Sequence, residues 1–336
     1  MWPAQAWKVN RQEKARRKQL EGETRLNDIR KAKTEGLCKL VPDPSQRESQ
    51  RAITKLESNK KRINGTHCPD CWIPLCNLKT WRSKQVNPDA KCVVCQRISM
   101  GRHACRECLR AIGLEVVLFM HANEWGRASN TGVLLRQALG ARVLVAGIPA
   151  DQAEIEALGR EASAAVLYPS SDSKSLPEFL CGLEQVNVQD LAGTKTTKEA
   201  SLPLSLTKNI TVIVVDSTWS QSKSLNKLLP TSLQRVRLDP EKVMEVDRGL
   251  ASPLRKQQVS GRLCSLTAVT TLIGEIAQYL AAGPLCEGTA NPKTLHPTPS
   301  EIVPNAVARL HEILSVKAAV VESSGRVIKL APSRPS

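Results

Sequence analysis

Apolar residues recur along this chain with two different periods, and the change from one to the other is clearest at residues 211–229. The run from Thr211 to Val215 is β-branched and almost wholly apolar, which is typical of a buried central strand. After Asp216, the leucines recur at helical spacing with lysines on the opposite face. The segment therefore predicts a strand, a polar turn and a helix.

The same alternation of strands and helices extends over most of the chain after residue 113. Further apolar runs predict strands at residues 114–121, 142–147, 164–170 and 236–239. Helical spacing predicts helices at residues 131–139, 153–159, 265–280 and 306–320. Residues 183–208 have the composition of a long loop, and residues 284–300 that of a Pro-rich linker. This order predicts an α/β domain with a mostly parallel sheet and helices on both faces.

Polar residues stand where several of these strands end, and Asp216 is the most informative of them. In an open α/β sheet, ligands bind in the crevice beyond the carboxyl ends of the strands. Asp216 or Ser217 could instead cap the following helix, because Asp and Ser are preferred N-cap residues. Trp219 favours a binding site, since a large amphipathic ring after a polar turn is suited to stacking or inward packing.

The charge of the chain indicates a polyanionic partner, which the pattern of strands and helices alone does not. The 336 residues carry a formal net charge of +16, and aromatic residues make up only 3%. This excess of Lys and Arg indicates RNA or DNA, although a basic protein with solvated tails has the same composition. Residues 1–62 contain too few apolar side chains for a core, so we expect a basic, largely disordered arm.

The sequence contains neither a run of about 18 apolar residues nor a secretory h-region. We therefore expect no membrane partner. We expect a nuclear or cytoplasmic protein, with an organellar transit peptide left open.

The cysteines gather in one segment, which we expect to form a zinc-binding module over residues 67–112. Paired C-x-x-C turns in an unsecreted chain indicate metal rather than disulfides. One set has the spacing C-x2-C-x9-C-x2-C and predicts a closed, structural zinc site formed by Cys92, Cys95, Cys105 and Cys108. A second set, completed by His67 or His103, could bind another zinc ion or none; its thiols are Cys68, Cys71 and Cys76.

Several motifs together resemble one family, the DTW domain proteins. DSTW at residues 216–219 is similar to the signature of that family, and HANEWGRASNTGVLL at 121–135 is similar to its H-P-x-E and N-T segment. VLYPS at 166–170, LRKQ at 254–257 and LCSLTAV at 263–269 also resemble family motifs, in the same order. The resemblance covers roughly residues 68–282 and assigns residues 113–325 to a catalytic domain.

The resemblance implies a tRNA-uridine aminocarboxypropyltransferase related to the SPOUT fold, with a knotted or knot-like carboxyl-terminal part. Such an enzyme moves the 3-amino-3-carboxypropyl group of S-adenosylmethionine to N3 of a uridine. N3 must lose a proton, so a carboxylate within hydrogen-bond reach is needed. Asp216 is the expected base, with Glu124 or a water held by His121 as alternatives. Trp219 is the expected stacking platform for the uracil.

The resemblance also implies the residues that contact the two substrates. Contacts with S-adenosylmethionine are expected from Tyr168, Pro169, Ser170, Thr218, Trp219, Leu263 and Ser265. Contacts with the tRNA are expected from Asn130, Thr131 and Arg255. No obligate protein partner is implied.

The chain departs from the family pattern at two positions, and two other functions remain open. Ala122 stands where proline is usual, and Thr267 where glutamate is common, so no role is assigned to a carboxylate there. An RNA methyltransferase of SPOUT type would share the fold and S-adenosylmethionine. A noncatalytic zinc- and RNA-binding protein would share the cysteines and the charge.

Overall fold

The computed structural model describes residues 44–74, 92–183, 209–249, 263–282 and 299–323, together with three single positions before them. The chain divides into two compact units, Met1–Gln50 and Arg51–Ser336. The second unit contains the sheet and the whole Cys-rich segment that the structure describes.

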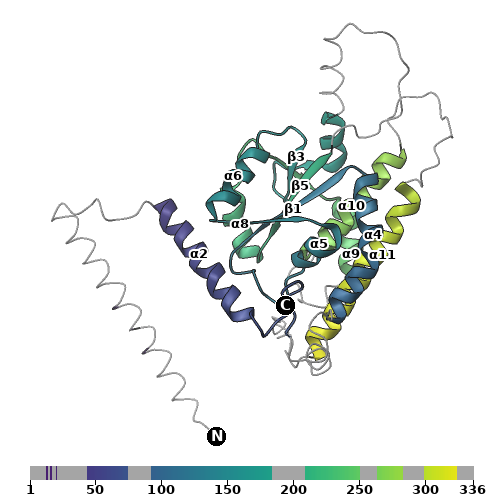
Figure 1. The fold of residues 1–336 in the computed structure, drawn as a ribbon. Coiled ribbons are helices and arrows are strands. Elements are labelled where there is room, and N and C mark those ends of the chain that lie inside the picture. The colour runs from purple at the N-terminus through teal and green to yellow at the C-terminus, as the bar shows by residue number, and fades with distance from the viewer. Residues whose placement is uncertain are drawn as a thin grey trace, which may run out of the picture. The chain divides into compact units, whose positions relative to one another are not determined.

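The core of the second unit is a six-stranded sheet in which every pair of neighbouring strands is parallel, as the alternating pattern predicts (Figure 1). Its order is β2-β1-β5-β3-β6-β4. The strands are β1 (Leu114–Met120), β2 (Arg142–Val145), β3 (Ala164–Leu167), β4 (Lys174–Ser175), β5 (Ile210–Asp216) and β6 (Gln234–Arg237). The β-branched run of β5 lies between β1 and β3, which is why it is apolar on both faces.

Helices cover both faces of the sheet because successive side chains of each strand point to opposite sides. Val116, Leu118 and Met120 of β1 pack in one core with helices α4 (Val93–Ala111), α5 (Gly132–Leu139), α10 (Ser265–Ala282) and α11 (Pro299–Ser323). Val117 and Phe119 pack on the other side with α6 (Pro149–Leu158) and α8 (Trp219–Leu228). The expected α/β layers are therefore confirmed.

Among the described residues, the helices not predicted from the sequence are α2 (Pro44–Ile63), α4, α9 (Pro240–Gly249) and the helical segment at 176–183. Helix α2 forms the carboxyl-terminal part of the segment that was expected to be a largely disordered arm, and most of residues 1–43 lie outside the described residues. Helix α4 was not predicted because the paired cysteines indicated metal-binding turns, and three of its seven buried positions are cysteines. Helix α11 begins earlier than predicted and contains Pro304 at its sixth position, where the proline ring removes one backbone donor of the helix.

The Cys-rich segment shares the core of the sheet instead of packing on itself. Trp72, Ile98 and Cys105 belong to the same buried cluster as Leu118 of β1 and Leu310 of α11.

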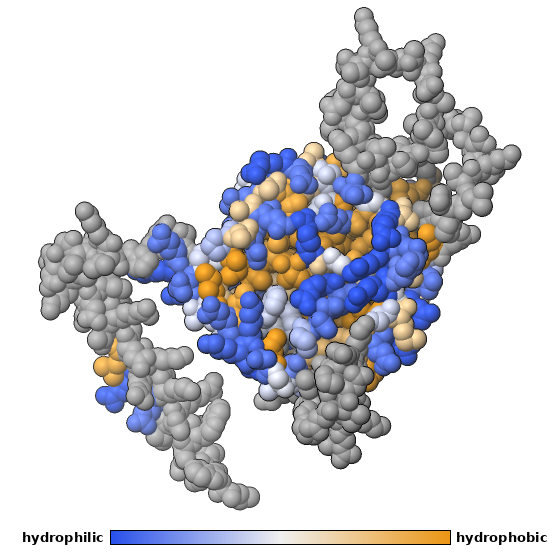
Figure 2. All heavy atoms as spheres, in the orientation of Figure 1, coloured by the Kyte–Doolittle hydropathy of each residue, from blue (hydrophilic) through white to orange (hydrophobic). Residues whose placement is uncertain are grey.

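In the space-filling view, hydrophobic surface lies near the centre of the displayed face and hydrophilic side chains border it (Figure 2). The knot expected from the resemblance stays a prediction, and the segments at 184–208 and 250–262 lie outside the described residues. Among the described residues, no helix has the length and apolar character needed to cross a membrane.

Candidate functional site

A cavity of about 900 Å³ opens where the carboxyl ends of β5, β3 and β6 meet the loop after β1. We call it the Asp216 cavity, and we call residues 121–131, between β1 and α5, the site loop. The chain leaves β1 toward β2 on one side and leaves β5 toward β6 on the other. The connections therefore diverge between β1 and β5, and this is where open α/β sheets bind ligands.

Asp216 lies at the last position of β5 and is buried. Its Oδ2 accepts a hydrogen bond of 2.6 Å from the side-chain amide of Asn130, and its Oδ1 accepts one of 2.5 Å from the Ser265 hydroxyl. Gly132 lies so close that a Cβ atom there would be 2.6 Å from Oδ2. The carboxylate is therefore held in one orientation by residues from three separate elements.

The alternative role of Asp216 as a cap for the next helix is taken by another residue. The N-cap position of α8 is Thr218, and the Gln221 side chain accepts a hydrogen bond from the Thr218 backbone N–H over 3.2 Å. The Ser217 hydroxyl donates to the Thr218 carbonyl oxygen. Asp216 is thus placed toward the cavity and the site loop, as a binding or catalytic group requires.

Asn130 contacts both the start of α5 and the Asp216 carboxylate. Its Oδ1 accepts a hydrogen bond of 2.8 Å from the backbone N–H of Val133, in the first turn of α5. Its Nδ2 donates to Asp216. Since the helix fixes one end of the amide, the other end presents a donor to the carboxylate in a set direction.

Glu124 also lines the cavity, with a side chain only 2% exposed. It accepts a hydrogen bond of 2.7 Å from Arg127, three residues later in the same loop. His121 does not line the cavity. Its ring Nδ1 accepts a hydrogen bond from the backbone N–H of Asn123, and the His121 backbone N–H donates to the Asp216 carbonyl oxygen. The structure therefore gives His121 a turn-forming contact next to the site.

Most residues expected to contact S-adenosylmethionine or tRNA lie around this one cavity. They are Tyr168, Pro169, Thr218, Trp219, Leu263, Ser265, Asn130 and Thr131. Ser170 does not line it. The Ser170 hydroxyl and backbone N–H both bond to the Ser173 hydroxyl in the turn after β3. Arg255 lies outside the described residues.

Two arginines that line the cavity were not predicted from the sequence. For Arg127, which forms an ion pair with Glu124, the three-residue spacing of the opposite charges was the available signal. Arg237 stands at the end of β6 and donates to the Ser173 carbonyl oxygen over 2.6 Å. Both cations lie at the same edge of the sheet as Asp216, so the cavity can receive a ligand with negative groups.

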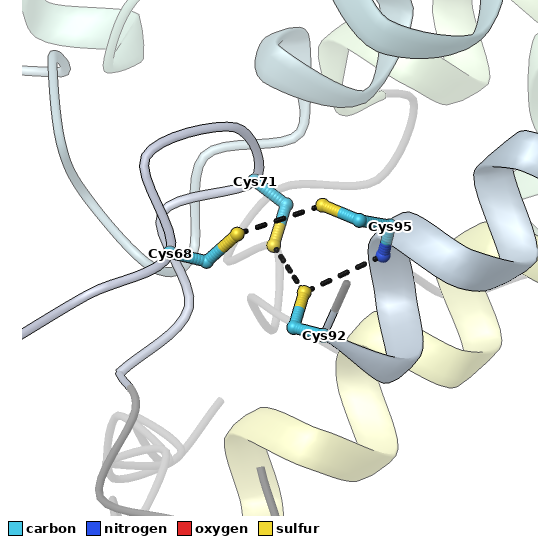
Figure 3. Close-up of side chains that lie close together, drawn as sticks. All are labelled: Cys68, Cys71, Cys92 and Cys95. Atoms are coloured by element: carbon cyan, nitrogen blue, oxygen red, sulfur yellow. Dashed lines mark hydrogen bonds between the residues drawn. The ribbon is translucent and has the colours of Figure 1, made fainter. Parts of the chain in front are cut away.

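A second constellation consists of four buried cysteines, Cys68, Cys71, Cys92 and Cys95, which we call the thiol cluster (Figure 3). Their sulfur atoms all lie within 4.8 Å of one another, with 3.5 Å between Cys68 and Cys95 and 3.3 Å between Cys71 and Cys92. A zinc tetrathiolate with bonds of about 2.3 Å has sulfur–sulfur edges of about 3.8 Å. Four thiols at this separation fit a closed, tetrahedral zinc site.

This grouping corrects the predicted set of ligands. Cys105 and Cys108 lie on α4, and Cys105 is ten residues beyond Cys95 on the same helix, a distance of about 15 Å. One ion cannot bind both pairs, so the partners of Cys92 and Cys95 are the cysteines of the preceding turn. His67 bonds to Thr66 and His103 is paired with Glu107 on the surface, while Cys76 lies outside the described residues.

The pKa values of the thiols agree with this division. The hydrogen bond between Cys71 and Cys68 lowers the pKa of Cys68 and raises that of Cys71. Burial raises the pKa of Cys105 to about 11, against a smaller opposing effect of Arg309, and raises that of Cys108 to about 12, with a smaller contribution from Cys105. Cys105 and Cys108 are accordingly protonated core side chains, with the Cys105 sulfur directed to the Ala306 carbonyl oxygen.

The fold and the two constellations define a class: an α/β protein with a carboxylate-lined cavity at the edge of a parallel sheet and a buried cluster of four cysteines that fits a zinc ion. A family model described as the DTW domain matches residues 89–295. This is more than half of the chain, and the chain belongs to the DTW domain family, as the motifs indicate. The membership supports a role in tRNA modification. Neither the curated proteins nor the solved structures contain a significant match.

Proposed function

We propose that this protein transfers the 3-amino-3-carboxypropyl group of S-adenosylmethionine to N3 of a uridine in tRNA. The observation that carries the proposal is the buried Asp216 carboxylate, oriented by Asn130 and Ser265 at the wall of a large cavity. Membership of the DTW domain family supports tRNA as the RNA, and the formal charge of +16 supports a polyanionic partner.

The cavity has a suitable size and chemistry for S-adenosylmethionine. About 900 Å³ lies in the upper range for a small-molecule site, and the lining combines apolar side chains with hydroxyl groups and two arginines. Tyr168, Pro169 and Leu263 would hold the adenosine part, and Thr218 and Ser265 would donate or accept hydrogen bonds. Arg127 or Arg237 would supply the positive charge that a carboxylate needs.

In the proposed reaction, Asp216 takes the proton from N3 of the uracil. A bond then forms between N3 and the aminocarboxypropyl carbon that is attached to sulfur, while the bond between that carbon and sulfur breaks and its electron pair remains on sulfur. The remainder of S-adenosylmethionine leaves as neutral methylthioadenosine. Trp219, half-buried at the start of α8, would stack on an unpaired uracil and expose its N3 edge to Asp216.

The zinc site has a separate, structural role in this proposal. Four thiolates complete the coordination of the ion, so no position is open for a substrate. The metal would stabilise the turn at residues 68–74 and the start of α4, which both pack against the core of the sheet.

The test is to incubate the protein with tRNA and S-adenosylmethionine that carries the label on either the carboxyl carbon or the methyl carbon. After digestion, mass spectrometry should find the carboxyl label on a uridine and methylthioadenosine in solution. A reaction without tRNA is the control. Transfer of the methyl label would instead support an RNA methyltransferase. Absence of cofactor binding by calorimetry would support a noncatalytic RNA-binding protein.

A further inference from the structure

Lys317 is a charged side chain in the interior that none of the steps above employs. It lies on α11, and its side chain is 0% exposed. Its ammonium donates hydrogen bonds to two backbone carbonyl oxygens, those of Cys71, over 3.1 Å, and of Asn130. Burial of an ammonium costs several kcal/mol unless hydrogen bonds and nearby negative charge compensate for it. The position of Lys317 in the fold suggests a role for this buried charge.

The two carbonyl groups belong to the two constellations of the protein. Cys71 is a member of the thiol cluster, and Asn130 donates its side-chain amide to Asp216. Lys317 therefore joins the backbone of the thiol cluster to the backbone of Asn130, and the Asn130 side chain in turn bonds to the Asp216 carboxylate. Lys317 is 246 residues from Cys71 and 187 residues from Asn130 in the sequence, so only the packing of α11 creates the connection.

The charges on each side of Lys317 favour the same arrangement. Zn²⁺ bound by four thiolates would carry a net charge of about −2, and the Asp216 carboxylate adds a further negative charge. Both would attract the Lys317 ammonium, which bonds to Cys71 of the thiol cluster and to Asn130 next to Asp216. Attraction to both holds the Cys71 turn and the Asn130 end of the site loop at the same buried point.

Aromatic packing joins the same two segments at a second place. Trp72 follows Cys71, and Trp125 follows Glu124 in the site loop. Their ring centroids are 5.0 Å apart with an interplanar angle of 47°. Trp72 is the one non-glycine residue with a positive φ in the described part of the chain, at 60°, a conformation that persists when its surroundings hold it. The turn of the thiol cluster is therefore packed against the site loop as well as bonded to it.

We propose that Lys317 is a positioning residue that transmits the placement of the metal-bound Cys71 turn to Asn130 and thereby orients Asp216. The inference rests on the proposed function for its effect on turnover, but the mechanical connection itself does not. Loss of Lys317 would leave the zinc ligands and the cavity walls intact and would release the Asn130 carbonyl. The site loop would then lose its connection to the thiol cluster, and the Asp216 carboxylate would lose its fixed direction.

The first experiment measures this connection by amide hydrogen exchange with mass spectrometry. In the wild-type protein, removal of zinc with a chelator should speed exchange both in residues 68–74 and in the site loop. In zinc-loaded Lys317→Met, the turn should stay protected while the site loop exchanges about 10-fold faster or more. Lys223→Met, on the exposed face of α8, is the matched control and should behave as wild type. Wild-type protection of the site loop in Lys317→Met would overturn the proposal.

The second experiment measures turnover and separates positioning from folding. In Lys317→Met, kcat should fall about 10- to 100-fold with KM for S-adenosylmethionine little changed, because a misplaced base weakens the chemical step more than binding. Lys317→Gln can still donate to a carbonyl group and should retain more activity than Lys317→Met. If the Met variant does not fold, Lys317→Gln is used for both the exchange and the turnover measurement. It should then show faster exchange in the site loop and a lower kcat than wild type, and wild-type values in both would contradict the role. Equal activity and zinc content in Gln, Met and wild-type proteins would contradict the role.

The two proposals can fail separately. A wild-type protein without transferase activity that still shows coupled exchange would reject the proposed reaction and keep the connection through Lys317. An active wild-type protein whose site loop is unaffected by Lys317→Met would do the reverse.

Discussion

The side-chain amide of Asn130 donates to Oδ2 of Asp216 over 2.6 Å, although the two residues are 86 positions apart. Asn130 also holds the first turn of α5, so the orientation of the carboxylate depends on a helix that follows a different strand. The strand that ends at Asp216 and the helix that follows Asn130 meet because β1 and β5 are adjacent in the sheet. The predictions below start from this arrangement.

Asp216→Asn should separate catalysis from structure. The new amide can accept from Asn130 with its oxygen and donate to the Ser265 hydroxyl with its nitrogen, so the free energy of unfolding should change by about 1 kcal/mol or less. Turnover should fall by a factor of about 10² to 10⁴, because an amide cannot take the N3 proton at neutral pH. Cofactor affinity by calorimetry should change little.

Asp172→Asn is the control, since Asp172 is exposed and does not line the cavity. It should retain wild-type turnover. Near-normal activity of Asp216→Asn across pH 6 to about 9 would assign Asp216 a structural role and direct attention to Glu124.

Gly132→Ala should displace the carboxylate directly. Its Cβ would lie 2.6 Å from Oδ2 of Asp216, well inside van der Waals contact, so the side chain or the start of α5 must move. We expect a loss of about 1–3 kcal/mol in stability and a fall in turnover of about 10-fold or more. Gly274→Ala, in α10 with open space around the new methyl group, should instead gain about 0.5–1 kcal/mol and keep its activity. Thermal unfolding and initial rates measure both variants.

Cys95→Ser and Cys105→Ser should differ in metal content. Cys95 belongs to the thiol cluster, so its loss should reduce zinc to well below one ion per chain and lower the melting temperature. Cys105 lies about 15 Å further along α4, and its serine variant should retain the zinc of the wild type. Elemental analysis of purified protein decides the matter. Equal loss of zinc in the two variants would return Cys105 to the ligand set.

The salt dependence of RNA binding should report the contribution of the basic amino-terminal segment. Residues 1–43 contain eleven Lys or Arg and six Asp or Glu. Each phosphate neutralised contributes a slope of about 0.7 to 0.9 in log K against log salt concentration, so deletion of these residues should flatten the slope. The deletion stops before α2, because Asn59 and Arg62 of this helix bond to carbonyl groups of the site loop. An unchanged slope would show that the segment makes no contact with the RNA.

Glu275→Gln should change how stability depends on pH. Glu275 on α10 is buried and accepts a hydrogen bond of 2.9 Å from the Asp239 backbone N–H. Burial raises its pKa above the ordinary value of 4.5. The folded state therefore holds the proton more tightly than the unfolded state, so this group stabilises the fold most below pH 4.5 and less as pH rises through the folded-state pKa.

The glutamine keeps the acceptor and has no charge, so the variant should gain stability relative to wild type as pH rises from about 5 to 8. Chemical denaturation at several pH values measures the difference. Glu156→Gln, exposed on α6, should show no such trend.

Local patterns in the sequence determined the sheet, its parallel strands and the place of Asp216 at a strand end. The reason is that burial on both faces requires continuous β-branched runs, and helices on a sheet require one apolar stripe. Family motifs added the chemistry, and they identified most of the residues around the cavity. These features depend on residues that are neighbours in the chain.

Tertiary structure decided which distant residues meet. The cysteine spacings were compatible with more than one tetrahedral set, and only the continuous helix α4, which separates Cys95 from Cys105, excludes the predicted one. Lys317 had no signal at all, because a lone lysine in an amphipathic helix is ordinarily solvated. Its burial follows from the packing of α11 against α4 and α10, and this packing carries the ammonium to Cys71 and Asn130.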